Sequence, residues 1–215
     1  MPQIFHRSFN VLSRVSIFGA IFFLAALGWV AAKTVRAPYY TGAFTVLEQP
    51  VPFSHRHHVG GLKIDCRYCH TAVEESAFAG MPTSKTCMNC HSQIWVGSPM
   101  LAPVRESYKP GGPPLEWNRV HQLPDFVYFN HSIHIHKGIG CVSCHGRVDE
   151  MPLTWQVQTL HMDWCLDCHR NPEQHVRPRE EVFNLAWEPG PEFNPQKYMK
   201  QYRIQSKTSC SVCHR

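Results

Sequence analysis

CRYCH at residues 66–70 is the first of five copies of one pattern, Cys-x-x-Cys-His. The other copies are CMNCH at 87–91, CVSCH at 141–145, CLDCH at 165–169 and CSVCH at 210–214. Together they use all ten cysteines of the 215-residue chain. A pattern repeated so regularly specifies one kind of site five times, and the fold has to be built around these sites.

Three kinds of site use paired cysteines. Disulfides of an exported protein and zinc sites both explain the Cys-x-x-Cys spacing. Neither explains the histidine that follows at once in every copy, although the chain has only 15 histidines. Cys-x-x-Cys-His is the attachment sequence of c-type haem. The pattern therefore predicts five covalently bound haem c groups, with zinc and disulfides as the alternatives.

Each residue of the pattern has a role in haem attachment. On a short helical turn the two cysteines lie on one face, where both sulfurs can bond to the porphyrin, and the next histidine binds the iron. The predicted attachment residues are Cys66, Cys69, Cys87, Cys90, Cys141, Cys144, Cys165, Cys168, Cys210 and Cys213. The predicted proximal iron ligands are His70, His91, His145, His169 and His214.

A second axial ligand distinguishes most electron-carrying haems from catalytic haems, which leave that position open. Histidines are plentiful, and FSHRHH at 53–58 and FNHSIH at 129–134 repeat Phe-x-His-x-x-His ahead of the first and third motifs. Histidines three residues apart share one helical face and can reach two neighbouring haems. The predicted distal ligands are His55, His58, His131, His134 and, four residues before Cys165, His161. Other candidates are His57, His121, His136, His175, Met81, Met151 and Met162.

The N-terminal segment has the composition of a membrane anchor. The first 47 residues contain no Asp or Glu, and residues 15–32 form an uncharged run between Arg14 and Lys33. As a helix this run is roughly 27 Å long, close to the hydrocarbon thickness of a bilayer. A cleaved signal peptide is the alternative, but its apolar region is shorter and ends in small residues, whereas this run carries Trp29 near its end.

The rest of the chain divides into two similar dihaem modules and a tail. With about 36 residues per motif, the exported part cannot bury a large side-chain core, so the haems themselves are expected to form the core. The expected fold is mainly α with much irregular structure, one transmembrane helix and a multihaem cytochrome c domain. The expected parts are a cytoplasmic tail (1–14), an anchor (15–32), a linker (33–52), dihaem module 1 (53–91), a Pro-rich connector (92–128), dihaem module 2 (129–169) and a C-terminal segment with the fifth haem (170–215).

Two segments outside the motifs allow local predictions. Residues 96–128 contain six prolines and a Gly-Gly pair, which indicates a connector rather than a helix. Its aromatic and aliphatic residues indicate that it lies against its own domain, the haems or a partner. The segment from Asn194 to Cys210 predicts one amphipathic helix that delivers the fifth motif.

The Phe-x-His-x-x-His and Cys-x-x-Cys-His patterns together resemble small bis-histidine multihaem cytochromes. The N-terminal anchor, the segments VPFSHRHHVGGLKIDCRYCH and WNRVHQLPDFVYFNHSIHIHKGIGCVSCH, and the C-terminal fifth motif further resemble the pentahaem (ActA) subunit family of bacterial alternative complex III, a quinol:electron-acceptor oxidoreductase. This resemblance implies a respiratory electron relay in which the first histidine of each pair binds the adjacent haem and the second binds another.

The resemblance also implies partners and a location. The partners are an iron-sulfur and molybdopterin-type periplasmic subunit, quinol-binding membrane subunits and a monohaem cytochrome c, with a terminal oxidase as a possible acceptor. The location is the bacterial inner membrane, crossed once, with the haem domain in the periplasm. The chain is expected to have no catalytic site of its own. The alternatives are a self-sufficient quinol dehydrogenase and a freestanding electron-transfer cytochrome. The net charge of +5 omits the haem propionates, so it does not indicate nucleic-acid binding.

Overall fold

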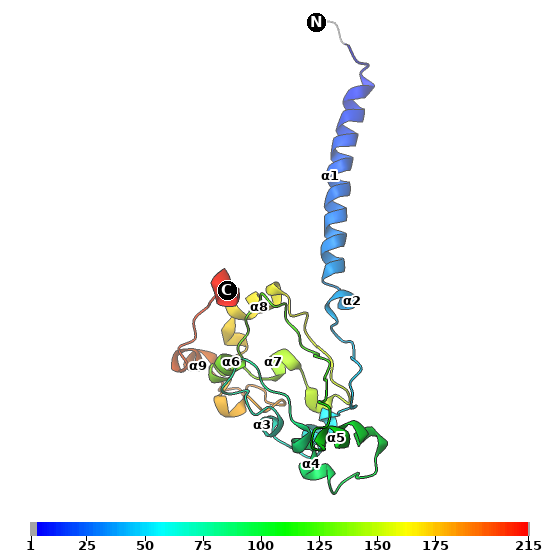
Figure 1. The fold of residues 1–215 in the computed structure, drawn as a ribbon. Coiled ribbons are helices and arrows are strands. Elements are labelled where there is room, and N and C mark those ends of the chain that lie inside the picture. The colour runs from blue at the N-terminus through cyan, green and yellow to red at the C-terminus, as the bar shows by residue number, and fades with distance from the viewer. Residues whose placement is uncertain (1–3, 215) are drawn as a thin grey trace. The chain divides into compact units, whose positions relative to one another are not determined.

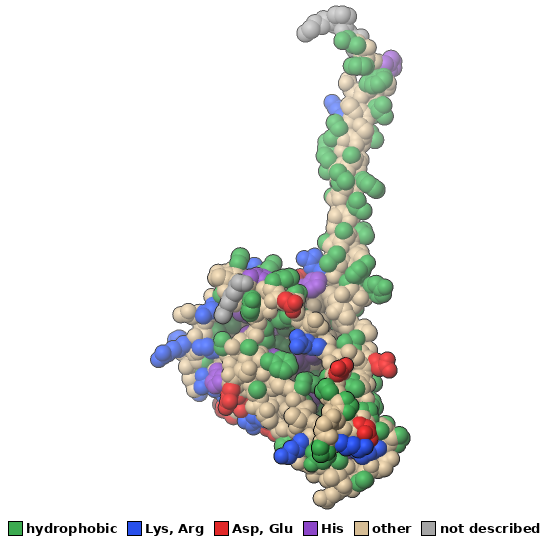
Figure 2. All heavy atoms as spheres, viewed as in Figure 1, with side chains coloured by type: hydrophobic (Ala, Val, Ile, Leu, Met, Phe, Trp, Pro, Cys, Tyr) green, Lys and Arg blue, Asp and Glu red, His purple; other side chains and the backbone are tan. Residues whose placement is uncertain are grey.

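The computed structural model describes residues 4–214, which divide into two units at Gly42 (Figure 1). The first unit consists of the long helix α1 (Ser8–Val35) and the single turn α2 (Pro38–Thr41). Within the described residues, α1 is the one helix that is long and apolar enough to cross a membrane, and none of its residues is buried against protein. Figure 2 shows apolar side chains along its visible face.

Helix α1 extends beyond the uncharged run at both ends. Its first turns include polar residues that remain helical because intrahelical hydrogen bonds satisfy the backbone, and Lys33 stands in its last turn, where a positive charge complements the helix dipole. Arg36 ends the helix, and Pro38 starts the next turn because proline cannot continue the preceding one.

The second unit contains short helices joined by long irregular segments. Between residues 43 and 214 the structure has no sheet, and three isolated bridges join Ala43 to Gln156, Val46 to Trp155 and Ile139 to Val176. This arrangement confirms the expected fold class, mainly helical with much irregular structure. The elements are η1 (Arg56–Gly61), α3 (Cys66–Cys69), α4 (Ser84–His91), η2 (Pro99–Leu101), α5 (Ala102–Tyr108), α6 (His131–His136), α7 (Val142–His145), η3 (Val148–Glu150), α8 (Met162–Arg170), η4 (Pro172–Gln174), η5 (Arg179–Glu181), α9 (Pro195–Gln201) and α10 (Cys210–Cys213).

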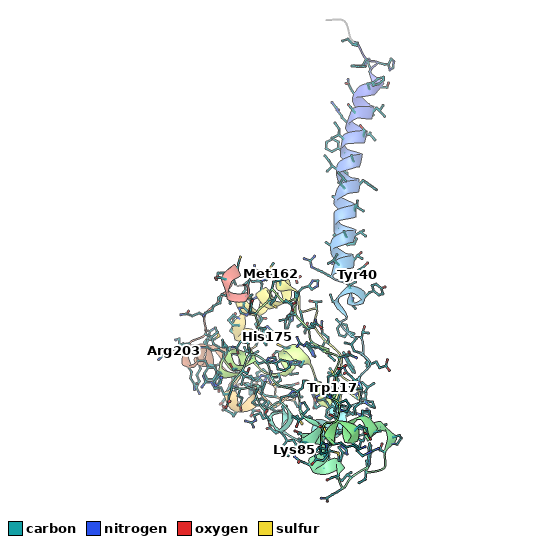
Figure 3. All side chains as sticks on the ribbon, in the orientation of Figure 1. Tyr40, Lys85, Trp117, Met162, His175 and Arg203 are labelled. Atoms are coloured by element: carbon teal, nitrogen blue, oxygen red, sulfur yellow. The ribbon has the colours of Figure 1, made fainter. Side chains whose placement is uncertain are left out.

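The side-chain core of the second unit is small. Ten hydrophobic residues among those described are buried, too few to form one continuous core for a unit of this length. A cluster of buried residues joins Val51, Leu101 and Val104, with Trp117 and Met88 packed against it. Trp117 lies near α5 in Figure 3.

The prediction that residues 96–128 contain no helix is wrong at 99–108. Pro99 is the first residue of η2 and Pro103 is the second residue of α5, positions where the missing backbone N–H has no intrahelical partner in any case. Burial of Leu101 and Val104 against α4 then holds this helix in place. The proline count indicated a connector, but the positions of the prolines permit a short helix.

The prediction of one helix from Asn194 to Cys210 is also wrong. The Asn194 side chain accepts a hydrogen bond from the Gln196 N–H and begins α9, as expected of an N-cap. The helix nevertheless ends at Gln201, because Tyr202 is buried and Arg203 (Figure 3) adopts a left-handed backbone with φ 51°. Cys210 therefore begins a separate turn, α10.

Candidate haem sites

All five Cys-x-x-Cys-His motifs lie on helical turns. The first, third and fifth occupy the single turns α3, α7 and α10, and the second and fourth end the longer helices α4 and α8. A helical turn places cysteines three residues apart on one face, as attachment to one porphyrin requires. Within residues 4–214 all ten thiols are free of disulfides.

The first motif shows how the local sequence builds its turn. The Asp65 carboxylate accepts a hydrogen bond from the Arg67 N–H at 2.8 Å and caps the start of α3. The same carboxylate accepts two hydrogen bonds from the Arg67 guanidinium at 2.9 and 2.8 Å. The guanidinium also stacks on the Phe183 ring at 4.6 Å, which ties the first motif to a distant segment.

The predicted proximal histidines share one hydrogen-bond arrangement. In four of the five, Nδ1 lies within hydrogen-bond distance of a backbone carbonyl: His70 with Gly80, His91 with Ile94, His169 with Lys207 and His214 with Phe126, at 2.8 to 3.1 Å. A carbonyl can only accept, so Nδ1 carries the proton and Nε2 is left with its lone pair. Metal-binding histidines are commonly oriented by such a bond, which also fixes their tautomer.

Three predicted distal histidines show the same arrangement. The Nδ1 atoms of His58, His131 and His134 lie 2.9, 2.8 and 2.7 Å from the carbonyls of Ser54, Ala77 and Asn130. Each of these side chains therefore also presents Nε2 as the free nitrogen. The fourth, His55, lies 2.8 Å from the Thr154 hydroxyl through Nδ1.

Ring separations test whether these histidines fit an iron. Two imidazoles bound through Nε2 on opposite sides of one metal, with metal–nitrogen bonds of about 2 Å, have ring centroids about 6 Å apart. The centroids of His58 and His91 are 6.2 Å apart, those of His131 and His145 are 6.3 Å apart, and those of His134 and His169 are 6.1 Å apart. In three motifs the residues therefore fit a haem with two axial histidines.

The surroundings of His55 are largely buried. Burial lowers the pKa of His55 to about 4, and the charges of His70 and other histidines lower it further. His55 directly precedes the π-helical turn η1, which carries His58 toward the second motif, and the assignment of His55 to the first motif stays a prediction. The α6 turn carries His131 and His134 toward the third and fourth motifs.

At the fifth motif the ring that stacks near the proximal histidine is an aromatic one: the centroids of Phe126 and His214 are 5.8 Å apart. His161 stands at the start of α8, one turn before Cys165. The end of α8 approaches the fifth motif, since His169 Nδ1 lies 2.8 Å from the Lys207 carbonyl. The role of His161 as a distal ligand stays a prediction. His57 is exposed and Met162 is 66% exposed. His175 and Met162 are labelled in Figure 3.

Two buried polar groups lie beside the third motif: His121, one of the other candidate ligands, and Arg177, which the sequence analysis missed. The His121 ring lies 4.3 Å from the His145 ring, and its Nε2 is buried without a hydrogen-bond partner. Burial lowers the pKa of His121 to about 4. The Arg177 guanidinium is also buried, with an unpaired Nε, and Gly140 makes room for it because a Cβ there would lie 2.3 Å from Arg177 Cζ. A buried arginine suits an anionic group such as a haem propionate.

The thiols of the third motif are the most strongly buried of the ones whose pKa is shifted. Burial raises the pKa values of Cys141 and Cys144 to about 12, with smaller contributions from neighbouring thiols. In the described part of the chain, no group of three or more His, Cys, Asp and Glu residues is arranged to hold a metal ion directly.

Comparisons with known proteins point to the same cofactor. A family model described as cytochrome c3 matches residues 133–215, which contain the third, fourth and fifth motifs. The chain is also 32% identical over 149 residues to the multihaem cytochrome c subunit of menaquinone reductase from Nitratidesulfovibrio vulgaris strain Hildenborough. That alignment covers 60% of this chain and 70% of the relative.

Proposed function

The chain belongs to the family of multihaem cytochromes c that includes the menaquinone reductase subunit, and on this premise we propose that it relays electrons through five haem c groups in a quinone-linked membrane complex. The proposed complex is of the alternative complex III type, which oxidises quinol and passes electrons to an acceptor. Its proposed partners are an iron-sulfur and molybdopterin-type subunit, quinol-binding membrane subunits and a monohaem cytochrome c, with a terminal oxidase as a possible acceptor.

The observation that best supports a role as an electron relay is the separation of the paired histidine rings, 6.1 to 6.3 Å in three motifs. Histidines on both sides of an iron leave no position for a substrate, which suits electron transfer rather than catalysis. When bound, haem c supplies a one-electron Fe(III)/Fe(II) couple. The chain's own residues attach it through cysteines, hold it between histidines, and fix the histidine tautomers through backbone carbonyls.

Exposed apolar residues support a role as a subunit. Ile94, Trp95 and Val96, directly after the second motif, are 57%, 62% and 51% exposed. Contiguous exposed apolar side chains of this size commonly mark a protein interface. The apolar helix α1 supports a single-pass anchor in the inner membrane, with the haem unit on the periplasmic side, where c-type haems are attached.

The comparison with a menaquinone reductase subunit favours a second direction of electron flow. In that case the chain passes electrons toward menaquinone rather than away from quinol. The pairing of the histidines is compatible with electron transfer in either direction. A relay is reversible, and the reduction potentials of its partners set the direction of net electron transfer.

A comparison of two preparations tests the proposal. One is the complex that co-purifies with this chain in mild detergent, and the other is the chain separated from it with its haem content confirmed. We expect menaquinol to reduce the haems, followed by their absorption bands, only in the complex. Reduction of the separated chain at the same rate would mean that it contains its own quinol site and is a self-sufficient dehydrogenase. Oxidation of the prereduced complex by menaquinone, without reduction by menaquinol, would support the reverse direction.

A further inference from the structure

We infer that the five haem motifs form one unbranched file in the spatial order second, first, third, fourth, fifth, so that the chain's first haem is an internal relay and its second haem is an end. This inference rests on the proposed occupancy of all five motifs and adds the path through them. Sequence order alone would place the first motif at an end.

The second and first motifs are joined directly. The Asn89 amide within the second motif donates a hydrogen bond to the Tyr68 hydroxyl within the first motif at 2.9 Å. The segment that leads into the first motif also reaches the second, since the ring centroids of His58 and His91 are 6.2 Å apart. On its other side, the second motif packs against α5 through Cys87 and Met88, and α5 carries no haem motif.

The first motif lies next to the third motif. Arg67 of the first motif stacks on the Phe183 ring, and the Cys141 N–H of the third motif donates to the neighbouring Val182 carbonyl at 3.1 Å. The Nδ1 of His131, which pairs with the third motif, lies 2.8 Å from the carbonyl of Ala77 in the loop after the first motif. Two independent segments thus hold the first and third motifs side by side.

The third motif lies next to the fourth motif, and the fourth lies next to the fifth. His131 and His134, three residues apart on α6, pair with the third and fourth motifs. His169 of the fourth motif lies 2.8 Å through Nδ1 from the carbonyl of Lys207, three residues before the fifth motif. Within the second unit, Figure 1 shows α4 and α5 at one end, α3 and α7 between, and α8 with the C-terminal turn at the other end.

In this file the second and fifth motifs are the two ends. Electrons therefore enter and leave at the second and fifth motifs, and every electron that crosses the chain passes the first and third.

Removing one haem at a time tests the file by electron paramagnetic resonance. Neighbouring ferric low-spin haems couple magnetically, and this coupling decreases steeply with distance. In the full-length holoprotein with Cys66→Ser and Cys69→Ser, we expect the second haem to lose its one neighbour and to give an uncoupled, slowly relaxing signal from one of the four remaining haems. In the matched control with Cys87→Ser and Cys90→Ser, we expect all four remaining haems to stay coupled.

The opposite pattern, with an isolated haem only after loss of the second motif, would overturn the inference and restore sequence order. A haem count other than five in the unmodified protein would instead contradict the proposed function, so the two failures are distinguishable. If a variant does not accumulate, iron positions in a density map of the unmodified protein decide the question. The first iron must lie between the second and the third, and any other neighbour for the second iron refutes the file.

Discussion

At the scale of single residues, backbone carbonyls determine what the histidines can do. Seven of the predicted iron ligands place Nδ1 near a carbonyl, which leaves Nε2 for a metal. A surface histidine without such a partner rotates freely and can present either nitrogen. The hydrogen bond therefore orients the ligand before the haem binds, and it separates His58 from its neighbour His57, which is exposed.

His58→Ala should convert one haem to a five-coordinate, high-spin state. His58 is the histidine paired with His91, so its loss opens one axial position at the second motif. The measurement is the high-spin ferric signal in the magnetic resonance spectrum, with a matching change in absorption. We expect one of the five haems to change, and His57→Ala, one residue away, to change none. A high-spin signal in His57→Ala but not in His58→Ala would contradict the assignment.

At the scale of elements, each motif needs a helical turn that is too short to be stable alone. A four-residue turn such as α3 forms few intrahelical hydrogen bonds, so caps and tertiary contacts have to hold it. Asp65 caps α3 and binds Arg67, and Arg67 packs on Phe183. The α6 turn, which carries the predicted distal ligands His131 and His134, is held in the same way, since Asn130 caps it by accepting from the Ile133 N–H.

Asp65→Ala should lower the stability of the holoprotein by about 1 kcal/mol, the usual cost of losing an N-cap. Asp65→Asn keeps an acceptor for the Arg67 N–H and should cost less, while Glu188→Ala, at an exposed position, should cost nothing measurable. The measurement is the midpoint of thermal unfolding at neutral pH. Equal midpoints for Asp65→Ala and Glu188→Ala would show that the cap is unimportant.

The contribution of Asp65 should also depend on pH. Its hydrogen bond with the Arg67 side chain holds the pKa of the carboxyl below its ordinary value of 3.8. Because the folded state favours the ionised form, this contribution is complete above the ordinary pKa and is lost as the pH falls through the lowered folded pKa. The difference in midpoint between the unmodified protein and Asp65→Asn should therefore shrink in acid, and a difference that grows in acid would contradict this origin.

At the scale of the whole molecule, the chain consists of an apolar helix and a separate unit that carries all five haem motifs. The unit from residue 43 buries few hydrophobic side chains, and its motifs contact one another through segments distant in sequence. A polypeptide with so small a core gains much of its stability from what it binds, because a ligand that binds only the folded state shifts the folding equilibrium. We therefore expect the unit to depend on its haems for folding.

Intact mass spectrometry of the membrane-extracted protein should find the full chain, with α1 retained, plus five covalently attached haem groups. We expect retention because the uncharged run within α1, residues 15–32, is longer than the apolar region of a cleaved signal peptide. The Cys210→Ser and Cys213→Ser double variant is the control and should lose the mass of one haem. A mass lacking the first thirty or so residues would identify a signal peptide, and a deficit of whole haems would identify unused motifs.

The amino-acid sequence by itself determined the multihaem cytochrome class, the mainly helical fold and the apolar N-terminal helix, because these depend on local patterns such as Cys-x-x-Cys-His and an uncharged run. The predictions of no helix at α5 and of one continuous helix from Asn194 to Cys210 were wrong, because burial of Leu101, Val104 and Tyr202 outweighs the local sequence signals. Tertiary structure alone decided which histidines face each other, the burial of His121 and Arg177, and the placement of the first motif between the second and the third. Such contacts join residues far apart in the chain, so spacing along the sequence does not contain them.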